Sequence, residues 1–285
     1  MKSPTVTRFF VFIISAMLLF SNAFAQMNCG TVAPRSFINA DMQAVKDSSA
    51  NQRGLFFPVD CLGKKLSITV YIFRDSLGND GITQASINSA VQIMNSDFAP
   101  MCLSFEVCRF VYVDNYNYNN YNFFKHEDEV YNLYYTPNTI NMYFSGKVLG
   151  PTGILVCGYS HFPGGRDMIF ITKGCAGDGK TLSHEMGHFF GLYHTFETGT
   201  GVELINGSNC LTAGDLICDT PADPGGSSGI DCQLNPYLAD INGNWYVPQI
   251  GNIMSYYSPA CKCGFTTQQF NRMIQQFLAN RNYLW

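Results

Sequence analysis

The segment from His184 to His194, which reads HEMGHFFGLYH, constrains the fold of this chain more than any other stretch. In a helix, residues four apart lie on one face, so the imidazoles of His184 and His188 converge while Glu185 sits beside them. Gly191 has the left-handed backbone freedom that ends a helix, and the reversed chain then returns His194 to the same point. The spacing therefore predicts a helix that ends near Gly191 and three imidazoles that meet.

Three neutral imidazole nitrogens are the ligand set of a zinc ion whose fourth position stays open for water, as in catalytic zinc sites. Zinc lowers the pKa of that water, and Glu185 is placed to take its proton and pass it to a leaving amine. The alternative, a helix with ordinary core histidines, is disfavoured because these five fixed positions rarely coincide by chance. We expect His184, His188 and His194 to bind zinc (Zn2+) and Glu185 to be the general base.

The N-terminus has the pattern of an export signal. Lys2 and Arg8 precede an apolar run over residues 9–20, and an A-F-A sequence ends at Ala25, so residues 1–25 predict a secretory signal peptide cleaved after Ala25. A retained anchor helix is the alternative, but the run is short for a bilayer. We expect a protein secreted to the extracellular space or a periplasm, without a membrane span.

Composition narrows the classes of protein and partner. The chain has 285 residues, of which 46% are apolar and 13% charged, and this excludes disordered, collagenous and coiled-coil proteins. It carries 17 basic against 21 acidic residues and no basic run, so nucleic acid is not an expected partner. The 11 cysteines all follow the predicted signal and indicate disulfides formed in an oxidising compartment, with at least one thiol left over.

The rest of the chain divides into parts of different character. Residues 26–53 are polar without a convincing period and are expected to be an N-terminal pro-segment, ahead of a catalytic domain over residues 54–285. Apolar or alternating patterns predict strands, and helical spacing predicts two amphipathic helices. The strands are expected at residues 65–73, 103–113, 140–144 and 167–172, the helices at 83–98 and 266–279, and an aromatic loop or edge at 114–124.

From residue 195 to 259 the chain is rich in Gly, Asp, Asn, Ser and Pro and has almost no periodic segment. A loop region of that length needs disulfides or bound ions to hold it. The order of elements predicts a mixed α/β first half and an irregular second half.

The elongated motif H-E-x-x-H-x-x-G-x-x-H is similar to that of the metzincin metallopeptidases, which place a methionine turn beneath the zinc. The stretch NIMSYY at residues 252–257 resembles this Met-turn. The resemblance implies that Met254 forms the floor under the ligands, with ordinary core packing as the alternative. It also implies that Tyr256 binds the metal or stabilises the tetrahedral intermediate.

More narrowly, the chain resembles the pappalysin family, particularly its ulilysin-like members. The matching pieces are the zinc segment with its continuation TFE, GDLICDTPAD at 214–223, the Met-turn, and FTTQQFNRM at 265–273. This resemblance implies an α+β fold of the metzincin type. We expect a twisted mixed sheet with two helices in the N-terminal part and an irregular C-terminal part with the Met-turn and a final helix.

The resemblance also implies calcium (Ca2+) in the irregular part. Asp215, Asp219 and Asp223, with Thr220, supply hard oxygen atoms at close spacing, although Asp and Thr are common in turns for other reasons. By resemblance we expect a disulfide between Cys232 and Cys261, and then local pairs such as Cys102 with Cys108, with five bridges among ten cysteines.

Cys29, in Met-Asn-Cys-Gly-Thr, resembles the cysteine with which some metzincins fill the fourth zinc position and stay inactive. A disulfide from Cys29 to Cys61 or another thiol is an equal alternative. If Cys29 is the latency ligand, activation follows cleavage near Arg53.

The expected activity is that of a zinc metalloendopeptidase, a secreted hydrolase that cuts peptide bonds in proteins as a monomer. A zinc hydrolase or exopeptidase acting on small peptides is the alternative, and a non-catalytic module is disfavoured by the intact Glu185. Ulilysin-like members that prefer a basic residue after the scissile bond have acidic residues shortly past the Met-turn, where this chain reads SPACKC at 258–263. We therefore expect a weak or apolar preference there.

Overall fold

The computed structural model describes residues 29–48, 61–228, 232–235, 238–240 and 242–285. The predicted signal peptide at residues 1–25 and the predicted domain boundary at residue 53 lie outside the described residues.

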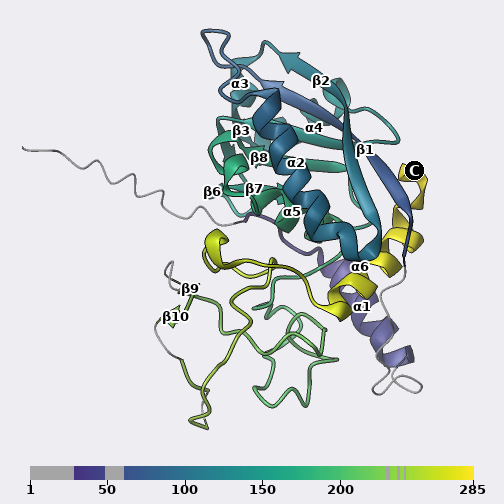
Figure 1. Cartoon of the computed structure of the whole chain (residues 1–285), viewed down its shortest axis with the longest axis vertical. Coiled ribbons are helices and arrows are strands. Elements are labelled where there is room, and N and C mark those ends of the chain that lie inside the picture. The colour runs from purple at the N-terminus through teal and green to yellow at the C-terminus, as the bar shows by residue number, and fades with distance from the viewer. Residues whose placement is uncertain (1–28, 49–60, 229–231, 236–237, 241) are drawn as a thin grey trace, which may run out of the picture.

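A five-stranded sheet organises the first half of the chain (Figure 1), in the order β2-β1-β4-β8-β7. The strands are β1 (Lys64–Phe73), β2 (Leu103–Val113), β4 (Ile140–Ser145), β7 (Gly158–Ser160) and β8 (Met168–Thr172). All neighbours run parallel except β7, which is antiparallel to β8 and forms one edge. The predicted strands are found within one residue of their expected bounds, and β7 is a further strand that no pattern indicated.

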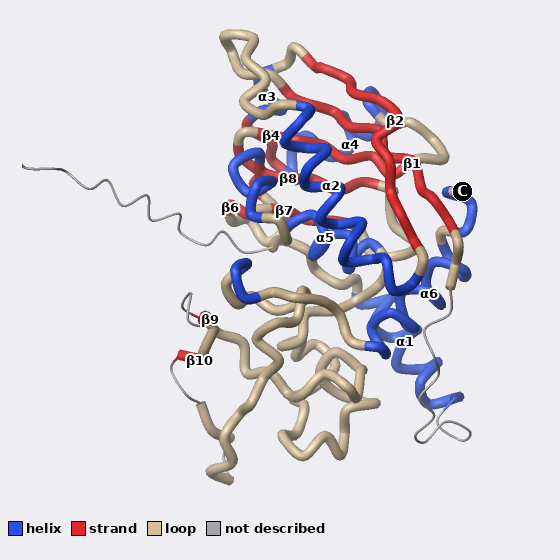
Figure 2. The backbone as a smooth tube through the Cα atoms, viewed as in Figure 1, coloured by secondary structure: helices blue, strands red, loops and turns tan. Residues whose placement is uncertain are grey.

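The sheet is covered on both faces, because side chains alternate along each strand. Ile68, Val70 and Ile72 of β1 belong to the core that includes residues of α2 (Gln84–Phe98) and α5 (Thr181–Phe189), while Tyr71 and Phe73 face a second, aromatic core. Helix α4 (Phe123–Tyr134) lies on that second face (Figure 2). The predicted α+β fold with a mixed sheet and two helices is confirmed.

Capping residues explain where the helices begin. The Thr83 side chain accepts a hydrogen bond from the Ser86 N–H at the start of α2. Thr266 and Gln269 form a reciprocal capping box at the start of α6 (Thr267–Asn280). Both helices match their predicted bounds within one residue.

Two segments have more regular structure than their composition indicated. The segment expected to lack a period contains α1 (Arg35–Ser48). The Asn/Tyr-rich segment contains α3 (Tyr116–Asn119), β3 (Asn120–Asn122) and the first turn of α4. Asparagine is a weak helix former inside a helix but a strong N-cap, and Asn115 and Asn122 both accept backbone hydrogen bonds as caps.

Short elements complete the described fold. Beside the main sheet, β3 pairs with β5 (Lys147–Leu149), and β5 pairs with β6 (Leu155–Val156). The second half has the 3-10 helix η3 (Pro259–Cys261), η4 (Asn282–Leu284) after α6, and the strand pair β9 (Ser227–Ser228) and β10 (Leu234–Asn235). The remaining 3-10 helices are η1 (Ala99–Met101) and η2 (Lys173–Asp178). The predicted irregular second half is therefore present (Figure 2).

Four disulfides are present among the described residues: Cys61–Cys102, Cys157–Cys175, Cys210–Cys218 and Cys232–Cys261. Cys232 and Cys261 are thus joined, as the family resemblance implied. The expected pair of Cys102 with Cys108 was wrong, because an extended strand of six residues separates these positions by about 20 Å. The expectation of five bridges was also wrong, since Cys29, Cys108 and Cys263 are free thiols.

Candidate active site

Helix α5 carries two of the predicted zinc ligands, and Asp178 sets its start. The Asp178 carboxylate accepts hydrogen bonds from the backbone N–H groups of Lys180 and Thr181, both at 2.8 Å. All residues from 182 to 189 are buried. The helix therefore lies inside the protein, where its side chains are held in fixed positions.

The end of α5 returns the third histidine to the other two. Gly191 has φ of 87°, the left-handed conformation that the sequence predicted. The Leu192 N–H then donates to the Gly187 carbonyl at 3.0 Å, which closes the last turn. The chain reverses there and brings His194 beside the helix.

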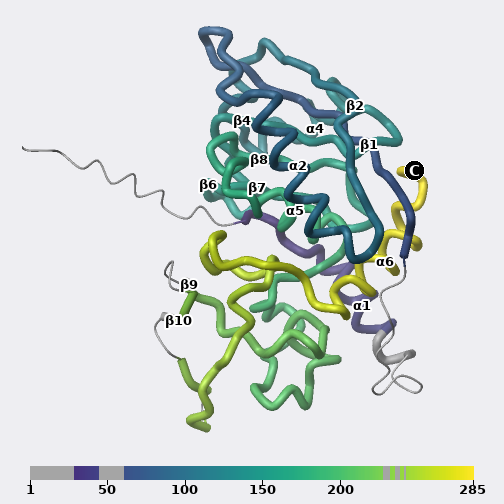
Figure 3. The backbone as a smooth tube through the Cα atoms, in the orientation of Figure 1, coloured from purple at the N-terminus to yellow at the C-terminus, as the bar shows by residue number. Residues whose placement is uncertain are grey.

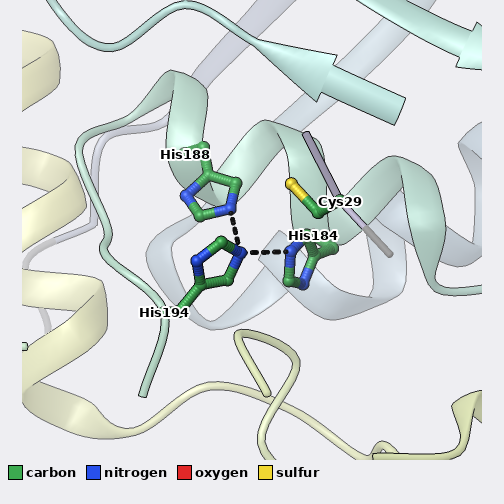
Figure 4. A group of neighbouring side chains, drawn as sticks. All are labelled: Cys29, His184, His188 and His194. Carbon is green, nitrogen blue, oxygen red and sulfur yellow. Dashed lines mark hydrogen bonds between the residues drawn. The ribbon is translucent and has the colours of Figure 1, made fainter. Parts of the chain in front are cut away.

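The three imidazoles converge on one point (Figure 4). The Nε2 atom of His194 lies 3.3 Å from that of His184 and 3.0 Å from that of His188. The Nδ1 atoms of His184 and His188 each lie 2.7 Å from a backbone carbonyl oxygen, of Ile253 and Leu192 respectively. A carbonyl only accepts, so Nδ1 carries the proton in both rings and Nε2 directs its lone pair toward the shared point.

This donor set fits a zinc ion. Tetrahedral zinc with Zn–N distances of about 2.0–2.1 Å separates its nitrogen ligands by about 3.3–3.4 Å, close to the separations seen here. Burial lowers the pKa of all three imidazoles, to about 3 for His188, so they stay neutral as a metal requires. Without a cation between them, buried lone pairs at this separation would repel one another.

Glu185 lies next to this cluster and is buried, with 1% of its surface exposed. A Cβ atom on Gly158 of the edge strand β7 would come within 2.8 Å of the Glu185 Cγ and 2.9 Å of the Phe170 carbonyl oxygen. Only glycine therefore lets β7 approach the carboxylate so closely. Burial raises the pKa of Glu185 to about 7, a value suited to a group that takes and gives a proton near neutral pH.

The predicted Met-turn lies beneath the histidines. Met254 is fully buried, and its N–H donates to the Asn252 side chain at 2.9 Å, which shapes the turn. A Cβ atom on Gly187 would lie 2.5 Å from the Met254 Sδ, so the methionine packs directly on the backbone of α5. Tyr256 follows, with its ring 4.7 Å from the His194 ring, centroid to centroid.

The N-terminal residues 29–31 occupy the site. The Cys29 Sγ and one ligand atom from each of the three histidines lie within 4.8 Å of one another, and no other such group was found among the described residues. The Tyr256 hydroxyl donates to the Cys29 carbonyl at 2.8 Å, and the Gly30 N–H donates to the Gly158 carbonyl at 2.8 Å. Residues 29–31 therefore bind along β7 and above the Met-turn.

Thr31 ties this segment to Glu185. Its hydroxyl donates to the Glu185 Oε2 at 2.9 Å and accepts from the Ser160 N–H at 2.9 Å. Its own N–H donates to the Cys29 Sγ at 3.2 Å. The pKa of the Cys29 thiol is raised by burial and by the charge of Glu185, so with no cation present the thiol keeps its proton.

Helix α1 continues from this segment (Figure 3), and its side chains pack in a small apolar cluster. Ile38 is buried in one cluster with Phe162, Tyr193 and Leu216, and Phe37 packs against it. The Phe37 and Phe162 rings are 5.0 Å apart, and the Phe162 ring is 5.6 Å from that of His188. The helix therefore covers a surface next to the three histidines.

The four predicted calcium ligands form hydrogen bonds with protein groups. Asp215 accepts the Thr220 hydroxyl at 2.9 Å, and Asp223 accepts the hydroxyls of Thr195 and Tyr257. Asp219 accepts the Gln268 N–H with one oxygen, and its other oxygen is buried without a partner. They do not form a group of converging ligand atoms.

Sequence reasoning missed Thr31 and Gly158. The Cys-Gly-Thr element was the available signal for Thr31, although its hydroxyl contact with Glu185 follows only from the three-dimensional path of the segment. No pattern distinguished Gly158 from the other glycines.

Comparison with known proteins agrees with this geometry. Residues 170–279 match the sequence model of the peptidase M43 family, described as pregnancy-associated plasma protein-A. An extracellular metalloprotease of Arthroderma gypseum is 28% identical, with 95% of this chain and 92% of that protein covered. One of Pyricularia oryzae is also 28% identical, covering 95% and 96% respectively.

Solved structures share the fold. A promirolysin mutant of Tannerella forsythia matches with a TM-score of 0.60 at 18% identity, covering 90% of this chain and 95% of its own. Mature mirolysin of the same organism, in complex with a cleaved peptide, matches with a TM-score of 0.56 at 20% identity, covering 77% of this chain and 93% of its own.

Among the described residues, none of the helices has the length and apolarity needed to cross a membrane.

Proposed function

We propose that this chain, whose residues 170–279 match the sequence model of the peptidase M43 family, is a pappalysin-type metalloprotease: a secreted zinc endopeptidase, made as a latent precursor, that cuts proteins or peptides. The observation that carries this proposal is the convergence of three imidazole Nε2 atoms beside the buried Glu185. The relatives named extracellular metalloproteases and the predicted signal peptide support export.

The zinc would be held by His184, His188 and His194, where it supplies Lewis acidity and a water of lowered pKa. Glu185 takes the proton of the attacking water and delivers it to the leaving amine. Its burial between α5 and β7 holds the carboxylate in one position for both transfers.

Tyr256 would donate a hydrogen bond from its hydroxyl to the scissile carbonyl oxygen as that oxygen becomes negative. In support of this role, its hydroxyl already donates to a peptide carbonyl at the site, that of Cys29. Met254 would keep the floor of the site apolar and rigid through its contact with α5.

The test of this function uses the chain after proteolytic activation, with the activating protease inhibited, and compares the parent with Glu185→Gln, which keeps the shape of the side chain but removes the base. We expect casein hydrolysis to fall by at least about a thousandfold while bound zinc, measured by elemental analysis, stays near one per chain. Thr198→Ala is the matched surface control and keeps its activity. Undiminished hydrolysis by Glu185→Gln would contradict the proposal, and cleavage of dipeptides without internal cuts in casein would favour the alternative, a hydrolase or exopeptidase of small peptides.

We further propose that residues 1–25 are the signal peptide, 26–53 the pro-segment and 54–285 the catalytic domain, with Cys29 as the latency ligand. The free thiol beside the three imidazoles supports this role, because a bound cation favours the thiolate. In further support, the neighbour titled promirolysin covers 90% of this chain, while mature mirolysin covers 77%.

Substitution of Cys29 tests the latency. We expect the full-chain Cys29→Ala protein to hydrolyse casein at least about tenfold faster than the parent before any processing, because the fourth zinc position becomes free. Cys108→Ala removes another free thiol, on β2, and should stay latent. A Cys29→Ala protein as inactive as the parent would rule out the switch.

Calcium remains a proposal for Asp215, Asp219, Thr220 and Asp223. Burial raises the pKa of Asp215 well above its ordinary value, which means that its negative charge lacks a sufficient counter-charge. A calcium ion would supply that charge and order a region with little core. We expect the melting temperature in EGTA to rise on addition of millimolar calcium, and no response would remove the proposal.

A further inference from the structure

The free edge of β7 binds a peptide backbone in this structure. The Gly30 N–H donates to the Gly158 carbonyl at 2.8 Å, and the Ser160 N–H donates to the Thr31 hydroxyl at 2.9 Å. The opposite edge of β7 pairs with β8, so these two backbone groups of β7 are directed away from the sheet. On one face of the strand, the Glu185 side chain packs on Gly158.

A second buried glutamate, Glu127 of α4, contacts β7 from its other face. It is 7% exposed and accepts hydrogen bonds from the Tyr159 hydroxyl, at 2.5 Å, and from the Tyr121 hydroxyl. Its other oxygen, Oε1, lies 2.7 Å from the Nε2 atom of His161, the residue directly after β7. Since Tyr159 and His161 flank Ser160, Glu127 holds the chain on both sides of the Ser160 N–H.

The contacts of Glu127 are charge-assisted. Burial by itself raises the pKa of this carboxyl group, but the hydrogen bond and charge of His161 and the two tyrosine hydroxyls bring its pKa below the ordinary value. A carboxylate only accepts, so His161 carries its proton on Nε2. Hydrogen bonds to a charged acceptor are roughly twice as strong as neutral ones. The Tyr159 ring also stacks on that of Phe170 of β8, 5.0 Å away, so its hydroxyl has little freedom to move.

The strand itself is weakly fixed by its own pairing. It has three residues, begins with a glycine and pairs on one side with β8. The Cys157–Cys175 disulfide anchors the chain just before β7, and Glu127 anchors its end through Tyr159 and His161. The position of the peptide-binding edge therefore depends on side-chain contacts as well as on the sheet.

We propose that Glu127 is a positioning residue, which holds β7 in place for the backbone of an extended peptide substrate. This inference rests on the proposed function. The Gly158 carbonyl then accepts from a substrate N–H as it accepts from Gly30 here. Without Glu127 the edge strand shifts, and the carbonyl no longer meets that N–H at hydrogen-bonding distance.

The test measures how strongly cleavage depends on the substrate N–H that the Gly158 carbonyl binds. A peptide and its backbone-ester analogues, in which oxygen replaces one N–H outside the scissile bond, are digested by the chain after proteolytic activation, with the activating protease inhibited. We expect the ester at one position to lower kcat/KM about tenfold for the parent and less than about threefold for Glu127→Leu. Glu127→Leu should also cut the all-amide peptide about tenfold more slowly, mainly through a higher KM.

Two further variants keep the test specific. Glu129→Leu replaces an exposed glutamate of the same helix and should keep the parent's ester effect. Tyr159→Phe removes one hydroxyl of the cluster but keeps the ring, so it should fold even if Glu127→Leu does not, and its ester effect should be smaller than the parent's. A lower amount of folded enzyme slows the cleavage of amide and ester peptides equally and leaves the ratio of their rates unchanged.

The outcomes separate this inference from the function on which it rests. The role of Glu127 would be overturned by an ester effect in Glu127→Leu or Tyr159→Phe as large as in the parent, or by the lack of any ester effect in the parent. If Glu185→Gln abolishes cleavage in the same assay, the endopeptidase function still stands. Cleavage that persists in Glu185→Gln would overturn the proposed function itself.

Discussion

At the scale of single residues, the buried carboxylates away from the histidines limit stability. Glu203 is 8% exposed, and burial raises its pKa to about 7 from an ordinary 4.5. Below about pH 4.5 the group is neutral in both the folded and the unfolded chain. As the pH rises to 7, it ionises in the unfolded chain first, so stability that is present in acid is lost.

Glu203→Gln should remove this loss. In the presence of a chelator, we expect the variant to melt about 3 to 6 °C higher than the parent at pH 8.5, which corresponds to a gain of about 1 to 2 kcal/mol in the free energy of unfolding. At pH 4.5 we expect the two proteins to melt at nearly the same temperature. Glu106→Gln, on the exposed part of β2, should change little at either pH. Scanning calorimetry over this range measures the effect, and a parent protein whose stability does not fall between pH 4.5 and 7 would contradict the argument.

At the scale of elements, α1 is held to the rest of the chain by both apolar and charged contacts. Its Phe37 and Ile38 pack on the cluster next to His188, and Asp41 forms an ion pair with Arg272 of α6. The Arg272 guanidinium also lies 4.6 Å from the centre of the Tyr193 ring. This docking helps to hold residues 29–31 at the site, so we expect the proposed latency to depend on contacts that begin eight residues along the chain from Cys29.

Phe37→Ala should therefore weaken latency without touching the catalytic groups. Loss of a half-buried phenyl ring is expected to cost about 2 to 3 kcal/mol of docking and to raise the rate of proteolytic activation several-fold, because the pro-segment dissociates more often. Asn39→Ala, an exposed position in the same helix, is the control. For both variants, the rate at which caseinolytic activity appears is measured during limited trypsin treatment. Equal rates for Phe37→Ala and Asn39→Ala would argue against a role for the Phe37 contact in latency.

At the scale of the whole molecule, one buried ion pair joins the C-terminus to the sheet. Arg281, which follows α6, is 1% exposed and lies 2.5 Å from Asp167 at the start of β8. It also donates to the carbonyls of His161 and Phe162, each at 3.0 Å. The final helix thereby supports the segment that connects the edge strand β7 to the apolar cluster around Tyr193.

Arg281→Met leaves Asp167 buried with its main counter-ion gone. We expect the free energy of unfolding to fall by about 3 to 5 kcal/mol, as is usual when one partner of a buried pair is removed. The exposed control Arg109→Met should stay within about 0.5 kcal/mol of the parent. Urea unfolding with zinc present gives both values, and a loss below about 1 kcal/mol would show that the pair contributes little.

Local sequence patterns were sufficient to predict several features, because each of these features depends on residues that lie close together in the chain. Helical spacing and Gly191 determine the convergence of the three histidines, and alternation determines the strands of the sheet. Composition did not predict structure where the effect of a residue depends on its position. Asn115 and Asn122, for example, cap two helices in a segment whose Asn-rich composition did not indicate helices.

The sequence by itself thus determined the histidine cluster, the glutamate beside it and the division into a regular and an irregular half. Tertiary structure alone decided which cysteines pair, that Thr31 bonds Glu185 across 154 positions, and that Gly158 of β7 lies against the Glu185 side chain. The physical reason is that hydrogen bonds and charges act over a few ångströms in space, and the chain path that brings distant residues within that range leaves no periodic signal in the sequence.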